Sequence, residues 1–303
     1  MKSIVRSVLV ALAVVGVLIV SASAQQPDFS KVEIKTTKIT DNFYALEGQG
    51  GRIGVLTGPD GVLMVDGQFA PLTEKIVAAI KQVSPQPIRF MVNTHVHGDH
   101  TGGNENFAKM GVVIYSRPQL RDRLAHPRPG ANGQPGTPAP AMALPKVTYN
   151  GRSTWFMNGE TVELVAIPQA HTDGDTMVHF PKADVIMTGD FFRSVGFPNI
   201  DRINGGSLNG MINGLGEVIG MAGPNTKILP GHGPIVDRNA VVAHRDMMLG
   251  VRDAVTKLIR EGKSEQEIVA ANPAGPFESK VQQPGETRDR FVSQVYAELK
   301  ARL

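Results

Sequence analysis

The feature that most constrains this chain is a cluster of four polar side chains, His95, His97, Asp99 and His100, within six residues. The cluster directly follows residues 88–92, an apolar run that has the pattern of a strand. Imidazole and carboxylate groups are ligands of transition metals. Surface histidines on a polar turn do not explain four such residues packed this closely. The fold is therefore expected to place a metal site at the end of a strand.

Two further histidines extend this pattern along the chain. Like the cluster, His171 and His232 each follow an apolar strand-like run and lie beside glycine. If His95 and His97 leave a strand in extended conformation, their side chains point to the same face, and Gly98 then permits a turn that aims the next two side chains elsewhere. So many donors cannot all bind one tetrahedral ion, which makes two ions the simpler interpretation.

Hydrophobic patterning predicts two halves, each with strands followed by helices. The expected strands are residues 43–46, 53–56, 62–66, 88–92, 112–115, 162–167, 177–180, 185–187 and 227–230. The expected helices are residues 72–83, 101–109, 208–221, 239–261 and 286–302. Residues 127–145 hold too many prolines and glycines for regular structure, and they suit either a lid over the site or an idle loop. Two such halves predict an α/β fold with two β-sheets back to back and helices outside, a four-layer αββα sandwich.

The first 24 residues have the composition of a secretory signal. Lys2 and Arg6 precede an apolar run, and Ala22-Ser23-Ala24 forms an A-x-A cleavage site. The run is shorter than the roughly 20 residues that a transmembrane anchor needs. We therefore expect a cleaved signal peptide at residues 1–24, a single domain at residues 25–303 and a periplasmic or secreted product without a stable membrane anchor.

Charge and cysteine content narrow the function further. Without Lys2 and Arg6 the chain has 29 basic and 28 acidic residues, so no strong basic patch remains to bind a nucleic-acid backbone. The chain has no cysteine, which excludes disulfides and thiolate ligands. A small molecule is therefore the expected partner, and the oligomeric state stays open.

The segment His95-Val96-His97-Gly98-Asp99-His100 resembles the H-x-H-x-D-H motif of the metallo-β-lactamase superfamily. Later elements fit the family in order, over roughly residues 40 to 260. They are Asp66 after a strand, His171 in Ala170-His171-Thr172, Asp190 in Thr188-Gly189-Asp190 and His232 in Gly231-His232-Gly233.

This resemblance implies a ligand set for two zinc ions. One ion would be held by His95, His97 and His171, the other by Asp99, His100 and His232, with Asp190 bridging both and Asp66 orienting ligands through hydrogen bonds. A departure from one part of the family is informative: because position 190 is Asp, the β-lactamase subclasses with a Cys ligand are excluded. An Asp bridge is more similar to the glyoxalase II, lactonase and RNA-processing branches.

The mechanism expected from such a pair of ions is hydrolysis. Two zinc ions about 3.5 to 4 Å apart lower the pKa of a shared water towards ~7 and stabilise the developing anion. Asp99 is a secondary candidate for the group that takes the proton of this water. The substrate is then a cyclic amide or ester, with a β-lactam as the best single choice, because export places the enzyme where those drugs act.

Other readings of the same motif stay open. They are a lactonase, esterase or thioester hydrolase, a sulfur dioxygenase with one iron on two His and an Asp, an RNA-processing nuclease, and a binding protein without catalysis. Export argues against the dioxygenase and the nuclease, and the retained donors argue against the last. Imidazole and carboxylate ligands alone do not separate zinc from iron or manganese.

A few residues outside the motif have open roles. Structural or surface positions are expected for His126, His179 and His244. Trp155 and Phe156 suit either an aromatic wall of the site or the core, and the core is favoured. Arg193, three residues after Asp190, is expected to rim the cleft. It is equally suited to bind a substrate carboxylate or to pair with an acidic neighbour.

Overall fold

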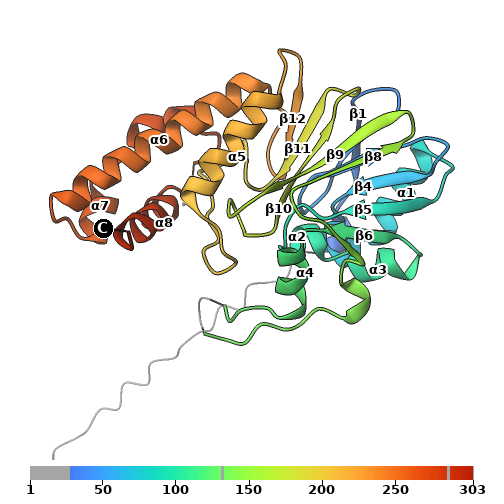
Figure 1. Ribbon diagram of the computed structural model, residues 1–303, viewed down its shortest axis with the longest axis horizontal. Coiled ribbons are helices and arrows are strands. Elements are labelled where there is room, and N and C mark those ends of the chain that lie inside the picture. The colour runs from blue at the N-terminus through green and yellow to red at the C-terminus, as the bar shows by residue number, and fades with distance from the viewer. Residues whose placement is uncertain (1–27, 131–132, 285–286, 303) are drawn as a thin grey trace, which may run out of the picture.

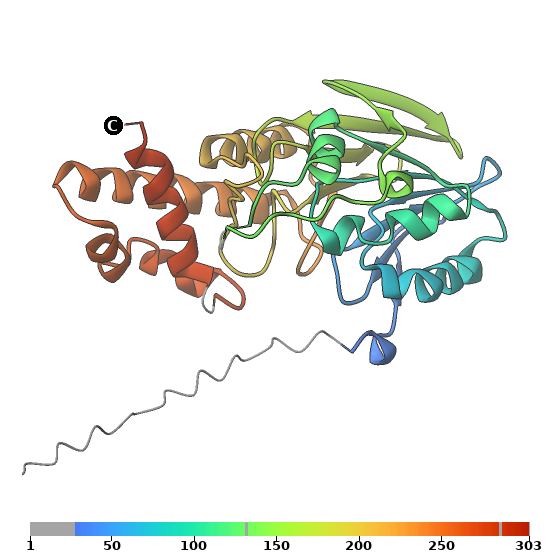
Figure 2. The ribbon, with the colours of Figure 1, turned by 90° about the horizontal axis from the view of Figure 1, so that it is seen from below.

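A computed structural model describes residues 28–130, 133–284 and 287–302. The predicted signal peptide, residues 1–24, lies outside this described part. Figure 1 shows a body of strands on one side and helices α6 (Arg238–Arg260), α7 (Glu265–Ala270) and α8 (Thr287–Lys300) extending from it on the other. The view from below in Figure 2 shows the same separation.

The first sheet has seven strands in the order in which they occur in the chain. Neighbouring strands are antiparallel from β1 to β4 and parallel from β4 to β7, so the sheet is mixed. Its strands are β1 (Lys35–Lys38), β2 (Phe43–Glu47), β3 (Ile53–Leu56), β4 (Val62–Val65), β5 (Ile88–Val92), β6 (Val113–Ser116) and β7 (Val147–Thr148).

The second sheet has five strands in the order β12-β11-β10-β9-β8. It is also mixed, since only β11 and β12 are parallel. Its strands are β8 (Arg152–Met157), β9 (Glu160–Ile167), β10 (Asp175–Phe180), β11 (Val185–Gly189) and β12 (Lys227–Pro230). Asn158 and Gly159, both with positive φ, form the turn between β8 and β9, as an Asn-Gly pair typically does in a hairpin.

The two sheets pack face to face around one apolar layer. Leu63 and Val65 of β4 pack in this layer with Val178 and Phe180 of β10. The alternate residues of β4, Val62 and Met64, pack with the helices on the other face. The sequence of residues 32–66 predicts strands with alternating apolar and polar positions. This prediction is wrong for β4, which is buried on both faces because it lies inside a four-layer structure.

Helices cover the outer face of each sheet. The first sheet is covered by α1 (Thr73–Val83) and α3 (Asn104–Lys109), which contribute Ile76, Ile80 and Phe107 to a second apolar cluster. The second sheet is covered by α5 (Leu208–Met221) and α6, and α8 packs on α6. The predicted αββα sandwich of two mixed sheets with helices outside is confirmed.

Three helical segments differ from the expectation. The single helix expected at residues 101–109 is two helices, α2 (Gly98–Thr101) and α3, because the amide of Gly103 donates to the carbonyl of Gln68 instead of continuing the helix. Helices α4 (Pro118–Ala125) and α7 were not expected. Both are short and polar, and α7 begins with a capping box between Ser264 and Glu267.

The remaining helical elements are short 3₁₀ turns at η1 (Phe29–Lys31), η2 (Ala70–Leu72), η3 (Ala141–Ala143) and η4 (Gly275–Lys280). Within residues 127–145 η3 is the regular helical element, so the expectation of little regular structure there holds. No described helix combines the length and apolar composition that crossing a bilayer requires.

Candidate metal centre

All seven predicted donors lie together at one edge of the sandwich, in segments that follow strands, with Asp99 and His100 in the short helix α2. The segment with His95, His97, Asp99 and His100 follows β5, and His171 lies between β9 and β10. The remaining two donors, Asp190 and His232, come directly after β11 and β12. Because both sheets end their strands at this edge, residues more than a hundred positions apart meet here.

The donor atoms form three overlapping groups, and within each group they lie within 4.8 Å of one another. Two of these groups match the ligand sets that the resemblance implied, and the third contains Asp190. The groups are His95, His97 and His171; Asp99, His100 and His232; and His95, His100 and Asp190.

Asp190 lies between the two implied sets. Its Oδ1 is 3.4 Å from Nε2 of His100, and its Oδ2 is 3.4 Å from Nε2 of His232 and 4.0 Å from Nε2 of His171. On one side of Asp190, Nδ1 of His97 is 3.0 Å from Nε2 of His171. These contacts give the carboxylate of Asp190 the position of a shared ligand.

Buried donor atoms without partners show that metal ions fit this site. Nε2 of His95, Nε2 of His100 and Oδ1 of Asp190 are buried and form no hydrogen bond, although the last two lie 3.4 Å apart as an ion pair. Leaving such atoms unpaired costs about 1–3 kcal/mol each, and a cation would satisfy all three. The nitrogen and oxygen donors suit zinc, and iron or manganese as well.

Asp66, directly after β4, forms hydrogen bonds that position the donor residues. Its Oδ2 is 2.7 Å from Nδ1 of His100 and accepts a 2.6 Å hydrogen bond from the Thr94 hydroxyl, while its Oδ1 accepts from the Thr94 amide at 2.8 Å. The backbone of Asp66 is in the left-handed region, at φ 65°. Asp66 therefore fixes the His100 ring so that Nε2 faces the other donors.

Two further partners of the histidine rings were not recognised from the sequence. Nε2 of His97 is 2.7 Å from Oδ2 of Asp201, and Nδ1 of His171 is 2.7 Å from the carbonyl oxygen of Asn199. Both partners come from the loop between β11 and α5. They orient the two rings so that the opposite nitrogens face the donor cluster. Asp201 carries no motif of its own, so its only signal in the sequence is its place in the same loop as Arg193, which is expected to rim the cleft.

Glycine is required at two positions by close packing. A Cβ atom on Gly51 would lie 2.1 Å from Cε1 of His100, and one on Gly231 would lie 2.0 Å from Oδ1 of Asp190. Such distances are far inside van der Waals contact. The backbone at these positions therefore forms part of the wall of the site.

Arg52 ties the loop of His232 to the first sheet. The Arg52 side chain is buried, donates to the carbonyl oxygens of Pro230 and Gly233, and pairs with Glu47. Its backbone amide donates to the carbonyl of Gly231. This role could not be predicted from the sequence, because Pro230 and Gly233 lie 178 and 181 residues away along the chain.

Opposite charges balance each other inside the centre. Burial lowers the pKa of His100, but Asp66 and Asp190 outweigh burial and hold it well above its ordinary value. Burial also lowers the pKa of His232, but its hydrogen bonds with Asp190 and Asp99 outweigh burial and raise this pKa to about 9. Burial lowers the pKa of His171 to about 4. Without metal, protons on His100 and His232 therefore provide the positive charge near the carboxylates.

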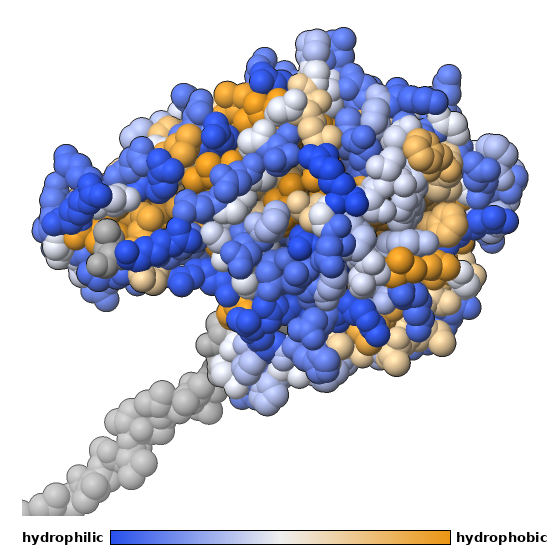
Figure 3. Space-filling view, viewed as in Figure 1, coloured by the Kyte–Doolittle hydropathy of each residue, from blue (hydrophilic) through white to orange (hydrophobic). Residues whose placement is uncertain are grey.

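The centre is open on one side only. The side chains of His97, Asp99 and His232 are 28%, 26% and 26% exposed, whereas those of His100 and His171 are fully buried. A substrate therefore reaches the donors over the edge formed by His97, Asp99 and His232. On the face in Figure 3 hydrophilic residues predominate, and hydrophobic ones form smaller patches.

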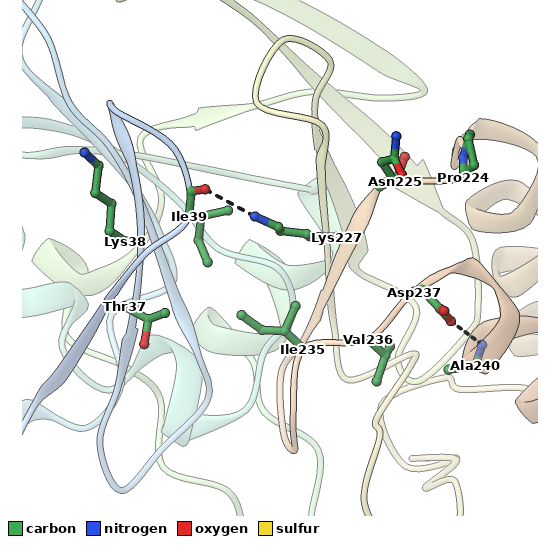
Figure 4. Close-up of a pocket in the computed structure, with 11 residues that line it drawn as sticks. Thr37, Lys38, Ile39, Pro224, Asn225, Lys227, Ile235, Val236, Asp237 and Ala240 are labelled. Carbon is green, nitrogen blue, oxygen red and sulfur yellow. Dashed lines mark hydrogen bonds between the residues drawn. The ribbon is translucent and has the colours of Figure 1, made fainter.

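Another cavity lies elsewhere and contains none of the seven donors. It is an open groove of about 670 Å³ beside β1 and β12 (Figure 4). Its polar side chains are used within the fold, since Lys227 donates to the carbonyl of Ile39 and Asp237 caps helix α6 at the amide of Ala240. We therefore place the functional site at the donor cluster and not in this groove.

The residues outside the motif have the following positions. His126 is exposed and pairs with Asp122. His179 of β10 pairs with Glu163 of β9, and His244 lies in α6 with its ring against Phe192. Trp155 packs on Tyr115 between the sheets, as expected of a core residue, with ring centroids 4.3 Å apart. The core expectation is wrong for Phe156, which is 81% exposed because it points away from the sandwich.

The residues of this chain match one protein family over two thirds of its length. A model of the metallo-beta-lactamase superfamily matches residues 47–249. The matched range begins in β2, ends within α6 and includes all seven donors.

Similar proteins differ in the reactions that their names state. The chain is 22% identical to a metallo-beta-lactamase type 2 of Bacillus cereus, over 64% of this chain and 71% of that protein. It is 28% identical to a hydroxyacylglutathione hydrolase of Nitrosococcus oceani, over 54% of this chain and 55% of that protein. The chain thus spans about half the length of the second relative.

A solved structure with the same fold is the stereoselective inverting sec-alkylsulfatase Pisa1 from Pseudomonas sp. It has a TM-score of 0.66 and 17% sequence identity, and the match covers 87% of this chain and 50% of that one. At this identity the likeness concerns the fold alone.

Proposed function

The chain belongs to the metallo-beta-lactamase superfamily, and from this we propose that it is an exported hydrolase with two zinc ions that opens a cyclic amide or ester. Hydrolase chemistry is what this superfamily supplies. The identity of the metal, the number of ions, the substrate and export are the parts that we propose.

The observation that carries the proposal is the pair of three-donor groups on either side of Asp190. His95, His97 and His171 would hold one ion, Asp99, His100 and His232 the other, and Asp190 would contact both. Separate sets of three protein ligands leave positions free for substrate or water, as catalytic zinc sites do.

When bound, the two zinc ions would supply Lewis-acid activation of water and of the substrate carbonyl at neutral pH. The open edge of the centre positions the substrate, because the buried rings of His100 and His171 block approach from the other sides. The carboxylate of Asp99, with Oδ2 3.0 Å from Nε2 of His232, lies on this edge. It would accept the proton of the attacking water, as a role secondary to binding.

A β-lactam is the best single substrate that we propose. The metallo-beta-lactamase of Bacillus cereus supports this choice, and export would place the enzyme where β-lactams act. Lactones, simple esters and thioesters follow, and the hydroxyacylglutathione hydrolase supports the thioester.

The substrate is tested by initial rates of the zinc-loaded protein on a chromogenic cephalosporin, an N-acyl lactone, an aryl ester and a glutathione thioester. We expect turnover of the cephalosporin, and its loss in His97→Ala and in Asp190→Ala. His126→Ala, which removes an exposed histidine outside the centre, is the matched control and is expected to keep the wild-type rate. Turnover of another panel member alone would reassign the substrate, and no turnover of any would refute hydrolysis.

Export is tested separately. We propose cleavage after Ala24, so that the mature chain begins at Gln25. Mass spectrometry of protein recovered from the periplasm is expected to give this N-terminus. Recovery of the uncleaved chain from the cytoplasm would contradict it.

A further inference from the structure

A second cavity lies beside the centre and contains basic groups that the proposed reaction does not use. It has a volume of about 160 Å³ and lies between the loop after β11, helix α6 and the segment after η4. Arg193, His244 and Lys280 line it together with apolar side chains such as Phe192 and Met247. Among the residues that the structure describes, those that line it include no acidic one.

One buried polar atom of this cavity lacks the partner that a purely structural role would give it. Nε2 of His244 is buried and has no hydrogen-bond partner, and the ring stands edge-on to Phe192 with centroids 5.0 Å apart. Buried polar atoms are nearly always paired, so an unpaired one inside a cavity indicates a ligand. The contact with Phe192 holds the ring in place but does not satisfy Nε2.

Arg193 is half-buried beside His244 and lacks an acidic partner. Its Nε donates to the carbonyl of Val195 at 2.9 Å, which fixes the guanidinium, yet within the described residues it forms no ion pair. Lys280 also forms none there, and the same holds for Arg290 nearby. The charge of Arg193 contributes to lowering the pKa of both His244 and Arg290, after the larger effect of burial. Among the described residues, these basic groups therefore lie together without a carboxylate. Of the two roles expected for Arg193, pairing with an acidic neighbour is not found there.

We propose that this cavity, the Arg193 pocket, binds a small organic carboxylate. A guanidinium offers two parallel donors to a carboxylate, and a neutral imidazole can add a third from Nε2. The apolar walls would contact a short hydrocarbon body. Drug-sized ligands need cavities of about 300 Å³ or more, so this one suits a carboxylate of only a few carbon atoms.

The pocket is connected with the centre through one short segment. The hydroxyl of Ser194, next to Arg193, donates to the carbonyl of Pro234 at 2.7 Å and lies 3.4 Å from the carbonyl of His232. The carboxylate has two possible sources, namely one end of the substrate or product of the centre, or a separate metabolite. The inference holds for either source and does not depend on the reaction at the centre.

The test uses sodium butyrate on the zinc-loaded mature protein, with butyramide as the neutral analogue of the same shape. We expect butyrate to shift the NMR signals of the His244 ring and to leave those of His126 in place. Calorimetry is expected to give an affinity for butyramide at least about tenfold weaker, because the amide lacks the charge that Arg193 binds.

Variants assign the binding to the pocket. Arg193→Gln is expected to weaken butyrate binding by about tenfold or more with unchanged zinc content, and Lys280→Ala by a smaller factor. Lys280 is exposed, so its variant keeps the test valid if Arg193→Gln folds poorly. Arg260→Gln removes the same charge from an exposed position of the same helix as His244, and it is expected to bind as the wild type does.

Kinetics with butyrate then identify the source. Competitive inhibition of hydrolysis would make the carboxylate part of the substrate or product, whereas binding without a change in KM would make the pocket a separate site. The proposal is overturned if butyrate leaves the His244 signals unchanged. It is also overturned if butyrate binds Arg193→Gln as tightly as the wild type, since binding would then be at the metal centre.

Discussion

His97 contributes to the centre through only one of its two ring nitrogens. Nδ1 faces His171 and Nε2 contacts Asp201, so the carboxylate selects the tautomer with the proton on Nε2 and leaves Nδ1 free as a donor to metal. Asp201 is itself held by the amide and the side chain of Asn204. The position of one metal ligand thus depends on a loop that supplies no ligand of its own.

Replacing Asp201 is therefore expected to weaken metal binding without removing a ligand. Asp201→Asn should lower zinc affinity about 10- to 100-fold, because the amide no longer selects the tautomer of His97. Competition with a chromogenic chelator measures this. Asp122→Asn, which changes the exposed carboxylate beside His126, is the matched control. Equal zinc affinity of the two variants would show that Asp201 has no such role.

Gly231 lies so close to Asp190 that we expect no side chain to be tolerated there. Gly231→Ala places a methyl group where Oδ1 of Asp190 now lies, so we expect loss of bound metal and of hydrolysis. Gly220→Ala, in α5 with open space around it, should keep both and gain up to about 1 kcal/mol of stability. Metal analysis of the purified variants gives the answer. Full metal content in Gly231→Ala would contradict the packing described above.

Among the elements, the centre depends on the joint between the two sheets, by which we mean the contact of Arg52 with the loop after β12. Arg52, directly before β3, donates hydrogen bonds to this loop, which carries His232. Arg52→Met keeps much of the volume but leaves two carbonyl groups without donors. We expect it to lower the free energy of unfolding by about 2–4 kcal/mol, measured with urea.

The control for Arg52 is an arginine in an exposed ion pair. Arg152→Met removes the contact with Glu217, where both side chains are more than half exposed. It should cost less than about 1 kcal/mol. Similar small losses in the two variants would mean that Arg52 does not hold the joint.

Helix α6 gives a prediction on pH. Burial, and secondly the charge of Arg193, lower the pKa of His244 to about 4 from an ordinary 6.5. Between these values the unfolded chain binds a proton that the folded chain does not, so stability is present above pH 6.5 and falls as the pH falls towards 4. As the pH falls over this range, the free energy of unfolding of the wild type should decrease by up to about 3 kcal/mol more than that of His244→Phe. Urea unfolding of both at about pH 7 and about pH 4.5 checks this, and parallel pH dependences would contradict it.

Most elements could be predicted because their cause is local. Strand β5, helix α5 and strand β12 have the predicted bounds, since apolar periodicity and flanking proline or glycine determine them. The break between α2 and α3 could not, because it depends on a bond from Gly103 to Gln68, more than thirty residues away. Helices α4 and α7 are too short and polar to have a clear periodicity.

In the site too, features with a local cause could be predicted from the sequence, and features that depend on distant contacts could not. The seven donors were predicted from residue type and motif, and the structure brings them together, while their role as zinc ligands stays a prediction. Asp201, Arg52 and the Arg193 pocket could not be derived from the sequence. Each depends on contacts between segments that only the folded chain brings together.

At the scale of the whole molecule, the fold brings distant strand ends to one edge. Four layers bury both sheets, and the loops at this edge are then free to carry polar groups. Helices α6 to α8 extend the second half beyond the sandwich (Figure 1), and the Arg193 pocket lies where this extension meets the loop after β11. The second half thus supplies both Asp190 and the surface beside it.

We propose that this edge of the sandwich holds two metal ions that share Asp190. Zinc titration of the metal-free mature chain tests this, with bound metal measured by chelator competition, for the wild type and for His232→Ala. We expect about two zinc ions per wild-type chain and about one in His232→Ala, because only the second donor group is broken. A single ion in the wild type, whether zinc or iron, or two ions retained in His232→Ala, would contradict it.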